Sequence, residues 1–340
     1  MITAAAHWDG SAWTEQSRGL TTTLMRVWGT DAEHAWAVSQ NSQVLAYEGT
    51  MWSVQSVVPR GALAAAWFTD QNAMWAVGYS GNVLRWDGKT WSSLTAGPSD
   101  SLNAIWGSDA DNVWAVGDRG TILRLRDGQW ISQSSGTSVS LLSIWGADAS
   151  NVWAVGMYNT VLKWNGMTWT SQTAAGGTQL FDVWGSDANN VWAVGSSGTM
   201  LRCKDGACSS VPSGTTQHLF SVSGTDANNV LTAGINSTLL RWNGMAWASL
   251  GLPAVWLSYG IWHADANNGW IVGDSGAVWQ LNSDPTHVTR VADYALRSVW
   301  GSSMNSVWAV GDAGTIIYWN GKVWTAQPSG TPKNLRGVWG

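Results

Sequence analysis

A tryptophan that returns every 39 residues is the feature that most constrains how this chain can fold. One step is 38 residues long, and one slot holds Ser223 in place of the aromatic residue. The tryptophans that keep the spacing are Trp28, Trp67, Trp106, Trp145, Trp184, Trp262, Trp300 and Trp339. A fixed period of this length indicates one supersecondary unit that is copied many times along the chain.

Every copy contains four short segments that are typical of β-strands. In one copy they cover residues 102–107, 113–117 and 121–124 and a run that begins at Trp130. They are rich in Val, Ile, Trp and Thr, and Gly, Asn and Asp separate them. Apolar residues nowhere follow helical spacing over a helical length, so we expect no helix.

The connections between these segments predict tight turns. A pair such as Asn165-Gly166 stands between the third and fourth segments, where a short hairpin requires residues with positive φ. An Asp such as Asp109 or Asp148 recurs between the first and second segments, and its carboxylate can accept hydrogen bonds from its own turn.

A four-stranded unit copied about eight times predicts an all-β fold, the β-propeller of four-stranded blades. Inner segments such as Val-Trp-Ala-Val are continuously apolar, which favours sheets buried on both faces over a two-sheet sandwich. Full copies are expected to begin near Leu24, Leu63, Leu102, Leu141, Leu180, Leu219, Ser258 and Leu296.

We expect one domain over residues 1–340, with a partial repeat at 1–23, eight full repeats over 24–334 and a partial repeat at 335–340. The alternative is nine blades, with one blade assembled from both chain ends and lacking its second strand. Because the sequence stops inside a repeat, we expect it to be a fragment of a longer chain.

The tryptophans are interpreted as the core between adjacent blades. All but Trp256 and Trp279 of the 29 fall on the four repeat positions, and each buried indole removes roughly 150–250 Å² from water. In one copy Ser223 and Leu231 replace the first- and second-strand tryptophans together, which predicts that these two positions contact each other. A competing interpretation makes the outer-strand tryptophans stacking platforms for sugars. That set is Trp86, Trp91, Trp164 and Trp169.

The only two cysteines predict a disulfide. Cys203 and Cys208 occupy the two hairpin slots that hold Trp164 and Trp169 one repeat earlier. Residues in these slots face each other across a hairpin at a separation that a disulfide can span. Two free thiols or a two-ligand metal site are the alternatives. A disulfide implies an oxidising compartment, so we expect an exported or cell-surface protein.

Composition limits the partners. Charged residues make up 11% of the chain, the net charge is −5 and no basic run occurs, which argues against nucleic acid. No apolar stretch reaches membrane-spanning length, so membrane insertion is not expected. The N-terminus lacks the charged and apolar regions of a signal peptide. We expect a monomer whose partner is a protein or a glycan.

The repeats resemble the BNR/Asp-box class of propeller repeats. The pattern Leu-x-x-Val-Trp-Gly, Asp-Ala-Asn-Asn-Val-Trp-Ala-Val-Gly, Gly-Thr-Ile-Leu and Trp-Asn-Gly-x-x-Trp is similar to photosystem II assembly factor-like and sialidase-like groups, and to Trp-rich repeats that bacteria export. The resemblance covers essentially the whole chain and implies a propeller. The Asp-box itself is reduced here to Asp/Asn-Gly-x-x-Trp, so we transfer the architecture and not the activity.

Catalysis is not expected, and neither is a cofactor. A sialidase-like enzyme would need an Arg cluster and a Tyr–Glu pair, but Glu15, Glu33 and Glu48 are the only glutamates. Most Asp residues are explained as turn formers, although a glycoside hydrolase stays an alternative because two suitably spaced carboxylates would suffice. The five histidines lack the spacing of metal ligands, so we predict no metal site.

Binding is expected on the loops, because these vary while the scaffold hardly does. The loops between second and third strands, and those from each fourth strand to the next blade, should emerge on one face. The variable loops of the second kind cover residues 132–140, 170–178 and 209–216. The candidate ligand-binding residues are Tyr79, Asp118, Arg119, Tyr158, Asp274 and Asp312. The preferred function is a non-catalytic binding or scaffold module, and the alternative is a carbohydrate-binding lectin.

Overall fold

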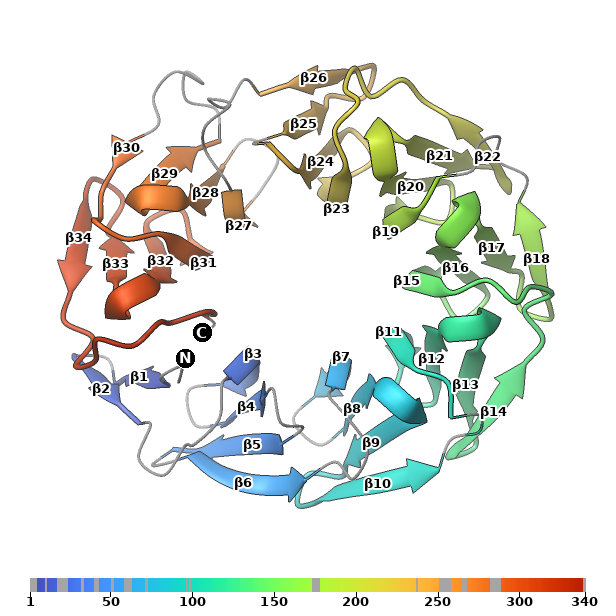
Figure 1. Cartoon of the computed structure of the whole chain (residues 1–340), viewed down its shortest axis with the longest axis horizontal. Coiled ribbons are helices and arrows are strands. Elements are labelled where there is room, and N and C mark those ends of the chain that lie inside the picture. Colours follow the sequence, from blue (N-terminus) through green and yellow to red (C-terminus); the bar gives the residue numbers. More distant parts are fainter. Residues whose placement is uncertain are drawn as a thin grey trace. The chain divides into compact units, whose positions relative to one another are not determined.

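Consecutive antiparallel strands build this molecule, as the computed structural model shows (Figure 1). It describes residues 5–9, 11–16, 24–31, 34–39, 43–49, 52–57, 63–70, 73–95, 97, 99–172, 178–236, 238–250, 258–264, 268–281 and 289–338. In these residues the strands form eight four-stranded sheets and one two-stranded hairpin. Each four-stranded sheet keeps its strands in chain order, which confirms the all-β propeller architecture with eight four-stranded blades.

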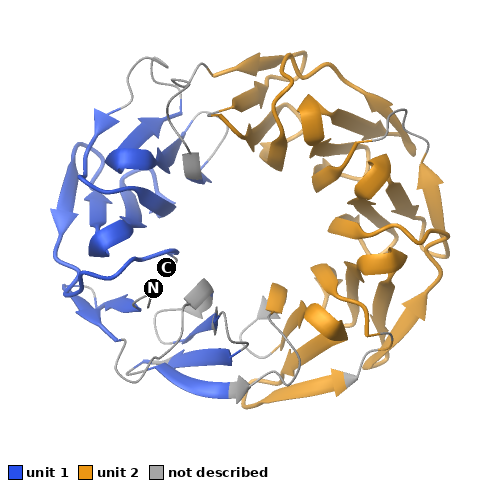
Figure 2. Cartoon of the chain, in the orientation of Figure 1, with its two compact units in different colours: residues 1–59, 251–340 blue, residues 60–250 orange. Residues whose placement is uncertain are grey.

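The chain divides into two compact units, residues 1–59 with 251–340 and residues 60–250 (Figure 2). Both division points fall between repeats. Unit 2 holds five blades: β7 (Leu63–Asp70), β8 (Ala73–Gly78), β9 (Asn82–Trp86) and β10 (Trp91–Thr95); β11 (Leu102–Asp109), β12 (Asn112–Gly117), β13 (Ile122–Arg126) and β14 (Gln129–Gln133); β15 (Leu141–Asp148), β16 (Asn151–Gly156), β17 (Val161–Trp164) and β18 (Trp169–Gln172); β19 (Leu180–Asp187), β20 (Asn190–Gly195), β21 (Met200–Lys204) and β22 (Ala207–Ser210); β23 (Leu219–Asp226), β24 (Asn229–Gly234), β25 (Leu239–Trp242) and β26 (Trp247–Ser249).

Unit 1 holds three blades and the short hairpin. Its strands are β1 (Ala6–Trp8) and β2 (Trp13–Glu15) of the hairpin; β3 (Leu24–Asp31), β4 (His34–Ser39), β5 (Gln43–Glu48) and β6 (Trp52–Val57); β27 (Ser258–His263), β28 (Gly269–Gly273), β29 (Ala277–Gln280) and β30 (Thr289–Arg290); β31 (Leu296–Ser303), β32 (Ser306–Gly311), β33 (Ile316–Trp319) and β34 (Trp324–Gln327). The first strand of every blade begins at the residue that the repeat predicted. The single domain expected over residues 1–340 stays a prediction.

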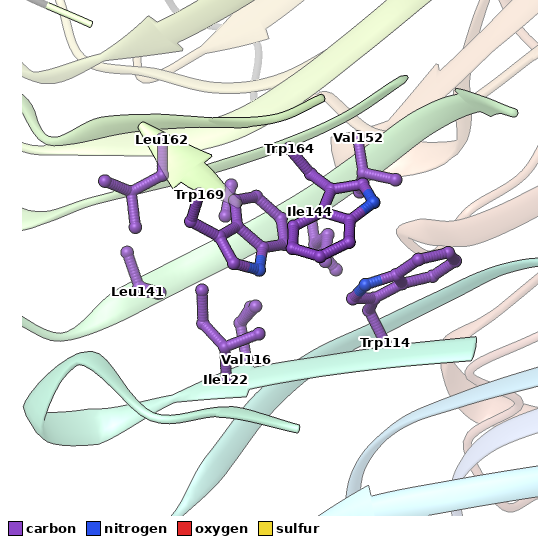
Figure 3. Packing of buried hydrophobic residues seen from close by; sticks show 10 residues of the cluster. Trp114, Val116, Ile122, Leu141, Ile144, Val152, Leu162, Trp164 and Trp169 are labelled. Carbon is purple, nitrogen blue, oxygen red and sulfur yellow. The ribbon is translucent and has the colours of Figure 1, made fainter. Parts of the chain in front are cut away.

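Side chains from adjacent blades interdigitate to form the core, as predicted for the tryptophans. In unit 2, Trp114 from β12 packs with Trp164 and Trp169 from the hairpin of the next blade (Figure 3). Val116 and Ile122 join them from the first blade, and aliphatic residues of β15 to β17 join from the second. Because these sheets pack on one another with aromatic and branched side chains, second strands such as β12, β16 and β20 are buried on both faces.

Packing also explains why glycine follows the periodic tryptophan. A Cβ on Gly146 would lie 2.5 Å from the ring of Trp106 in the preceding blade, and a Cβ on Gly185 would lie 2.7 Å from Trp145. The same contact recurs at Gly107, Gly224 and Gly301, so in these blades a ring of one blade fits against a glycine of the next. Glycine is needed here for space, since none of these positions has a positive φ.

A cation in the third strand lies between two indoles. The Arg124 guanidinium carbon is 4.9 Å from the centroid of Trp114 in its own blade and 5.2 Å from Trp164 in the next. Its Nη2 donates to Asn112 at 3.1 Å. The recurring arginine is thus a structural residue, and its attraction to the rings adds to the packing.

The turns follow the sequence prediction closely. The Asn165 side-chain oxygen accepts from two backbone N–H groups of its hairpin at 3.0 and 2.9 Å, and Gly166 has φ of +94°. Asp109 accepts from Asn112 with both carboxylate oxygens, at 2.9 and 3.1 Å. Ser223 pairs directly with Leu231 across β23 and β24, which confirms that these two positions contact each other.

The expectation of no helix needs one correction. Six single-turn 3₁₀ helices occur in the described residues: η1 (Tyr79–Gly81), η2 (Asp118–Gly120), η3 (Met157–Asn159), η4 (Ser196–Gly198), η5 (Asp274–Gly276) and η6 (Asp312–Gly314). Each joins the second strand of a blade to the third, and one turn is too short to leave an apolar period in the sequence. No helix in the described part of the chain is long and apolar enough to cross a membrane.

Candidate functional site

The six predicted binding residues all lie in the 3₁₀ turns, one turn to a blade. In unit 2 these turns lie on the side of the blades that faces the viewer in Figure 1. Tyr79, Asp118, Arg119 and Tyr158 belong to unit 2, whereas Asp274 and Asp312 belong to unit 1. Tyr79, Asp118, Asp274 and Asp312 begin their turns, whereas Arg119 and Tyr158 are the middle residues of theirs. Their role in binding stays a prediction.

The acidic members of the set have structural partners. Asp118 accepts from the Asn103 side chain at 3.2 Å, and the Arg297 guanidinium donates to both carboxylate oxygens of Asp312. Arg119 forms an ion pair with Asp100 at 3.2 Å, although its side chain is largely exposed. These contacts fix the turns to the adjacent first strands or loops, which a sequence pattern alone does not show.

The two tyrosines are exposed members of the set, as Arg119 is. Tyr158 is 72% exposed and Tyr79 is 54% exposed. Tyr158 occupies the middle of η3 with φ of +53°, a conformation that side chains other than glycine rarely adopt. The turn thus presents a large aromatic side chain to solvent.

Hydrogen bonds hold several of the loops that lead from a fourth strand to the next blade. Ser213 donates to the Gly198 carbonyl at 2.7 Å, which ties the loop after β22 to η4. Similar Ser-Gly-Thr turns occur at residues 135–137 and 329–331, where each serine bonds to the carbonyl of its threonine. The variable loop of residues 170–178 lies partly outside the described residues, at 173–177.

An aromatic cluster that is partly exposed lies in unit 2 and was not predicted. The Phe181 and Phe220 rings, from β19 and β23, are 5.1 Å apart, and His218 lies 6.4 and 6.2 Å from them. Phe220 is 50% exposed. The chain has only three phenylalanines against 29 tryptophans, and two of them meet here, outside the buried core. Their spacing of 39 residues was the available signal.

Asp182 holds the two strands of this cluster together. Its carboxylate accepts from Ser143 Oγ of β15 at 2.9 Å, from Val183 N at 3.0 Å and from Val222 N of β23 at 2.9 Å. Burial raises the pKa of the Asp182 carboxyl above its usual range, and the three hydrogen bonds oppose that rise only in part. One side chain thus links three consecutive blades beside Phe181.

An open groove of about 740 Å³ borders the aromatic cluster. Its walls carry hydroxyl groups from Thr178, Ser197, Thr199, Ser213, Thr215 and Thr216. Ser197 connects the two features, because its backbone N–H donates to Nδ1 of His218 at 3.0 Å. Aromatic rings and hydroxyl groups are therefore neighbours on one surface of unit 2, which we call the aromatic–hydroxyl surface.

The two cysteines form a disulfide in the structure. Cys203 and Cys208 face each other across β21 and β22 with a Cα–Cα distance of 4.0 Å. They join a core cluster with Trp153 of the preceding blade, the position where other blades place two hairpin tryptophans. Lys163 lies 5.0 Å above the Trp153 ring. The covalent link thus takes the place of an aromatic pair.

The outer-strand tryptophans proposed as sugar platforms are mostly inside the core. Trp86, Trp164 and Trp169 are buried, and Trp91 is half-buried. A sugar could stack on the buried rings only if the blades separated. In the described residues no group of three or more His, Cys, Asp or Glu side chains could hold a metal ion.

Solved structures share the fold at low sequence identity. YCF48 bound to a D1 peptide is 18% identical with a TM-score of 0.55, over 83% of this chain and 98% of that one. YCF48 from Cyanidioschyzon merolae is 17% identical with a TM-score of 0.52, over 77% and 96%. The computationally designed Ika8 protein is 14% identical with a TM-score of 0.65, over 91% and 97%.

No protein-family model matches the sequence, and no curated protein matches it. At identities this low, the similar structures show the propeller fold alone. YCF48 is a photosystem II assembly factor. The expected resemblance to photosystem II assembly factor-like propellers is therefore supported at the level of fold. The assignment to the BNR/Asp-box class stays a prediction.

Proposed function

We propose that this protein is a non-catalytic binding module that recognises an extended peptide segment of a partner protein on the aromatic–hydroxyl surface of unit 2. The observation that carries the proposal is the contact of exposed Phe220 with half-buried Phe181 and His218, outside the core. Aromatic side chains that cluster outside a core are typical anchors for a partner. Hydroxyl groups in the adjoining groove can form hydrogen bonds with the backbone N–H and C=O groups of an extended peptide.

Similar structures support a peptide over other ligands. One propeller with the same fold, YCF48, has been solved bound to a D1 peptide. The sugar alternative has less support, because its proposed stacking rings lie mostly between blades. A hydrolase has little support as well: Asp109, Asp187 and Asp226 are engaged in turns, and Asp182 accepts three hydrogen bonds.

Phage-displayed dodecapeptides selected on the wild-type protein test this proposal. Enriched peptides should contain aromatic or aliphatic anchors. In calorimetric titration they should bind the double variant Phe181→Ser/Phe220→Ser at least about tenfold more weakly, since a central aromatic contributes more than 1.4 kcal/mol. The matched control is Phe68→Ser, because Phe68 is 40% exposed on β7 outside the cluster. Equal affinity for wild type and double variant would remove this surface as the site.

We further propose that the protein works in an oxidising compartment. The support is the Cys203–Cys208 disulfide, since such links persist mainly in exported proteins. Alkylation of free thiols in the native cells, followed by mass spectrometry of the 203–208 peptide, measures the state directly. The peptide should escape alkylation until a reductant is added, and immediate labelling of both cysteines would contradict the proposal.

A further inference from the structure

His218 lies at the junction of two blades of unit 2, and both blades hold it. Its backbone carbonyl accepts from Ile235 N of its own blade at 3.0 Å. Its ring nitrogen Nδ1 accepts from Ser197 N of η4, in the preceding blade, at 3.0 Å. These two fixed points set both the position and the rotation of the imidazole. The ring is therefore in place before any partner binds, which lowers the entropy that binding must overcome.

The bond between His218 and Ser197 has a counterpart in another blade. In unit 1, Asn334 Oδ1 accepts from Ala313 N of η6 at 3.0 Å, across the same separation of 21 residues. A carboxamide oxygen is thus enough to hold the middle residue of such a turn. At the equivalent position before the three preceding first strands, the chain has Ser101, Ser140 and Gln179. The turn alone therefore does not require an imidazole.

The same bond fixes which ring nitrogen of His218 carries the hydrogen. The backbone N–H of Ser197 can only donate, so Nδ1 must offer its lone pair. In a neutral imidazole the other nitrogen then carries the hydrogen. Nε2 of His218 is therefore a hydrogen-bond donor.

This donor is unused and accessible. Nε2 of His218 makes no hydrogen bond within the part of the chain that the structure describes, and it is not one of the buried polar atoms. The rings of Phe181 and Phe220 lie 6.4 and 6.2 Å from the imidazole, and the Phe181 ring is perpendicular to it. One polar donor thus remains available beside two aromatic side chains.

The surroundings of His218 favour an uncharged acceptor. None of the residues that line the adjoining groove is charged. A carboxylate bound there would lose hydration without gaining a cation in return, which is costly. A main-chain carbonyl is uncharged, and an extended peptide carries one at every residue.

We propose that His218 determines the specificity of the aromatic–hydroxyl surface, by donating from Nε2 to one main-chain carbonyl of the bound peptide. This carbonyl lies beside the peptide side chain that packs on Phe181 and Phe220. The inference rests on the proposed function, because it assumes that a peptide binds here. The surface then selects the direction of the peptide chain as well as an apolar side chain, since only one direction brings the carbonyl to Nε2.

The variant His218→Asn separates the contact with the peptide from the contact with the turn. Its Oδ1 can still accept from Ser197 N, as Asn334 does from Ala313 N, while its amide nitrogen falls at the place of the ring carbon Cδ2. A phage-selected dodecapeptide that binds the wild type should bind this variant about fivefold more weakly in calorimetric titration, the effect of one hydrogen bond. Equal affinity would overturn the proposal.

Thioamide peptides identify the acceptor. Sulfur replaces one main-chain carbonyl oxygen at a time, which weakens that acceptor. At one position beside the anchor the replacement should cost about threefold on the wild type and nothing on His218→Asn. Lost ring contacts in the variant would weaken every peptide alike and leave this difference intact. Equal costs on both proteins at every position would rule out the contact, and so would a dependence on His218 that vanishes when a polar peptide side chain is replaced by alanine.

Nitrogen-15 NMR of the free wild-type protein near pH 8 tests the assigned tautomer. Correlations from the ring hydrogens of His218 should show the hydrogen on Nε2 and a lone pair on Nδ1. A hydrogen on Nδ1 would overturn the proposal, because Ser197 N could not donate to it.

The variant Phe181→Ser/Phe220→Ser distinguishes failure of this inference from failure of the proposed function. Weak binding by that variant together with unchanged binding by His218→Asn would keep the surface as the site and remove the His218 contact. Unchanged binding by both variants would place the peptide elsewhere and remove both proposals.

Discussion

A methyl group added at Gly146 tests the packing rule that joins consecutive blades. Its Cβ would lie 2.5 Å from the Trp106 ring, whereas carbon atoms in contact prefer about 3.5 Å, so the ring or the blade must retreat by about 1 Å. Overpacking of this size costs about 1–3 kcal/mol. The backbone contributes no penalty, because the φ of Gly146 lies outside the left-handed region.

A double-mutant cycle separates the steric cost from every other effect of the substitution. Trp106→Ala alone should destabilise by about 3–5 kcal/mol through the cavity that it leaves. With the ring absent the methyl group has room, so Gly146→Ala should then cost less than about 0.5 kcal/mol. The two changes should therefore couple by about 1–3 kcal/mol.

Urea unfolding at 25 °C, followed by far-ultraviolet circular dichroism, measures all four corners of the cycle. Gly128→Ala serves as the control, because nothing lies near its Cβ and its cost comes from a φ of +75° alone. That cost should be the same with or without Trp106. Additive energies for Gly146→Ala and Trp106→Ala would refute the idea that the glycine exists to admit the ring.

Three other perturbations follow from the same contacts. Cys203→Ser/Cys208→Ser should lower the free energy of unfolding by about 2 kcal/mol, because the disulfide restricts the unfolded chain only over a short loop. A reductant should change the urea midpoint of the wild type but not of the variant. Arg124→Met should cost about 1–2 kcal/mol, measured by the same unfolding, because the stem stays while the ring contacts and one hydrogen bond are lost; an unchanged midpoint would contradict this. For Asp182 the folded-state pKa is raised above its ordinary 3.8, so the folded protein binds the proton more tightly than the unfolded chain. The stability of the wild type relative to Asp182→Asn should therefore fall as pH rises above about 4, in urea midpoints from pH 3 to 7, and a rising difference would contradict the assigned direction.

The repeat predicted the fold because the residues that pack the blades recur from copy to copy. The Trp-Gly pair, the Asp that caps its turn and the Asn-Gly hairpin each have one local cause, and each cause recurs at a fixed spacing. The eight first strands could therefore be placed to the residue. The 3₁₀ turns could not be predicted, because a single turn with one left-handed residue, such as Arg119 or Tyr158, leaves no periodic pattern of apolar residues.

The candidate site was harder to predict than the fold, since it depends on departures from the pattern. Variation at Asp118 and Asp312 suggested ligand contacts, but both carboxylates accept hydrogen bonds from the first strand of their own blade. Phe181 and Phe220 occupy a variable position of the first strand, and their spacing of 39 residues is the one sequence signal that pairs them. Only the structure shows that they meet beside a groove.

The ring-to-glycine contact has a direction, and that direction bears on how such a chain can grow. Copies that carry the Trp-Gly pair offer an indole to their successor and room at the glycine to their predecessor, as Trp106 and Gly146 do, so such copies can follow one another. A crossover between equivalent points of two copies would insert or delete a whole number of 39-residue units and leave each junction intact. The gene segment for one blade is thus a natural unit of duplication and loss.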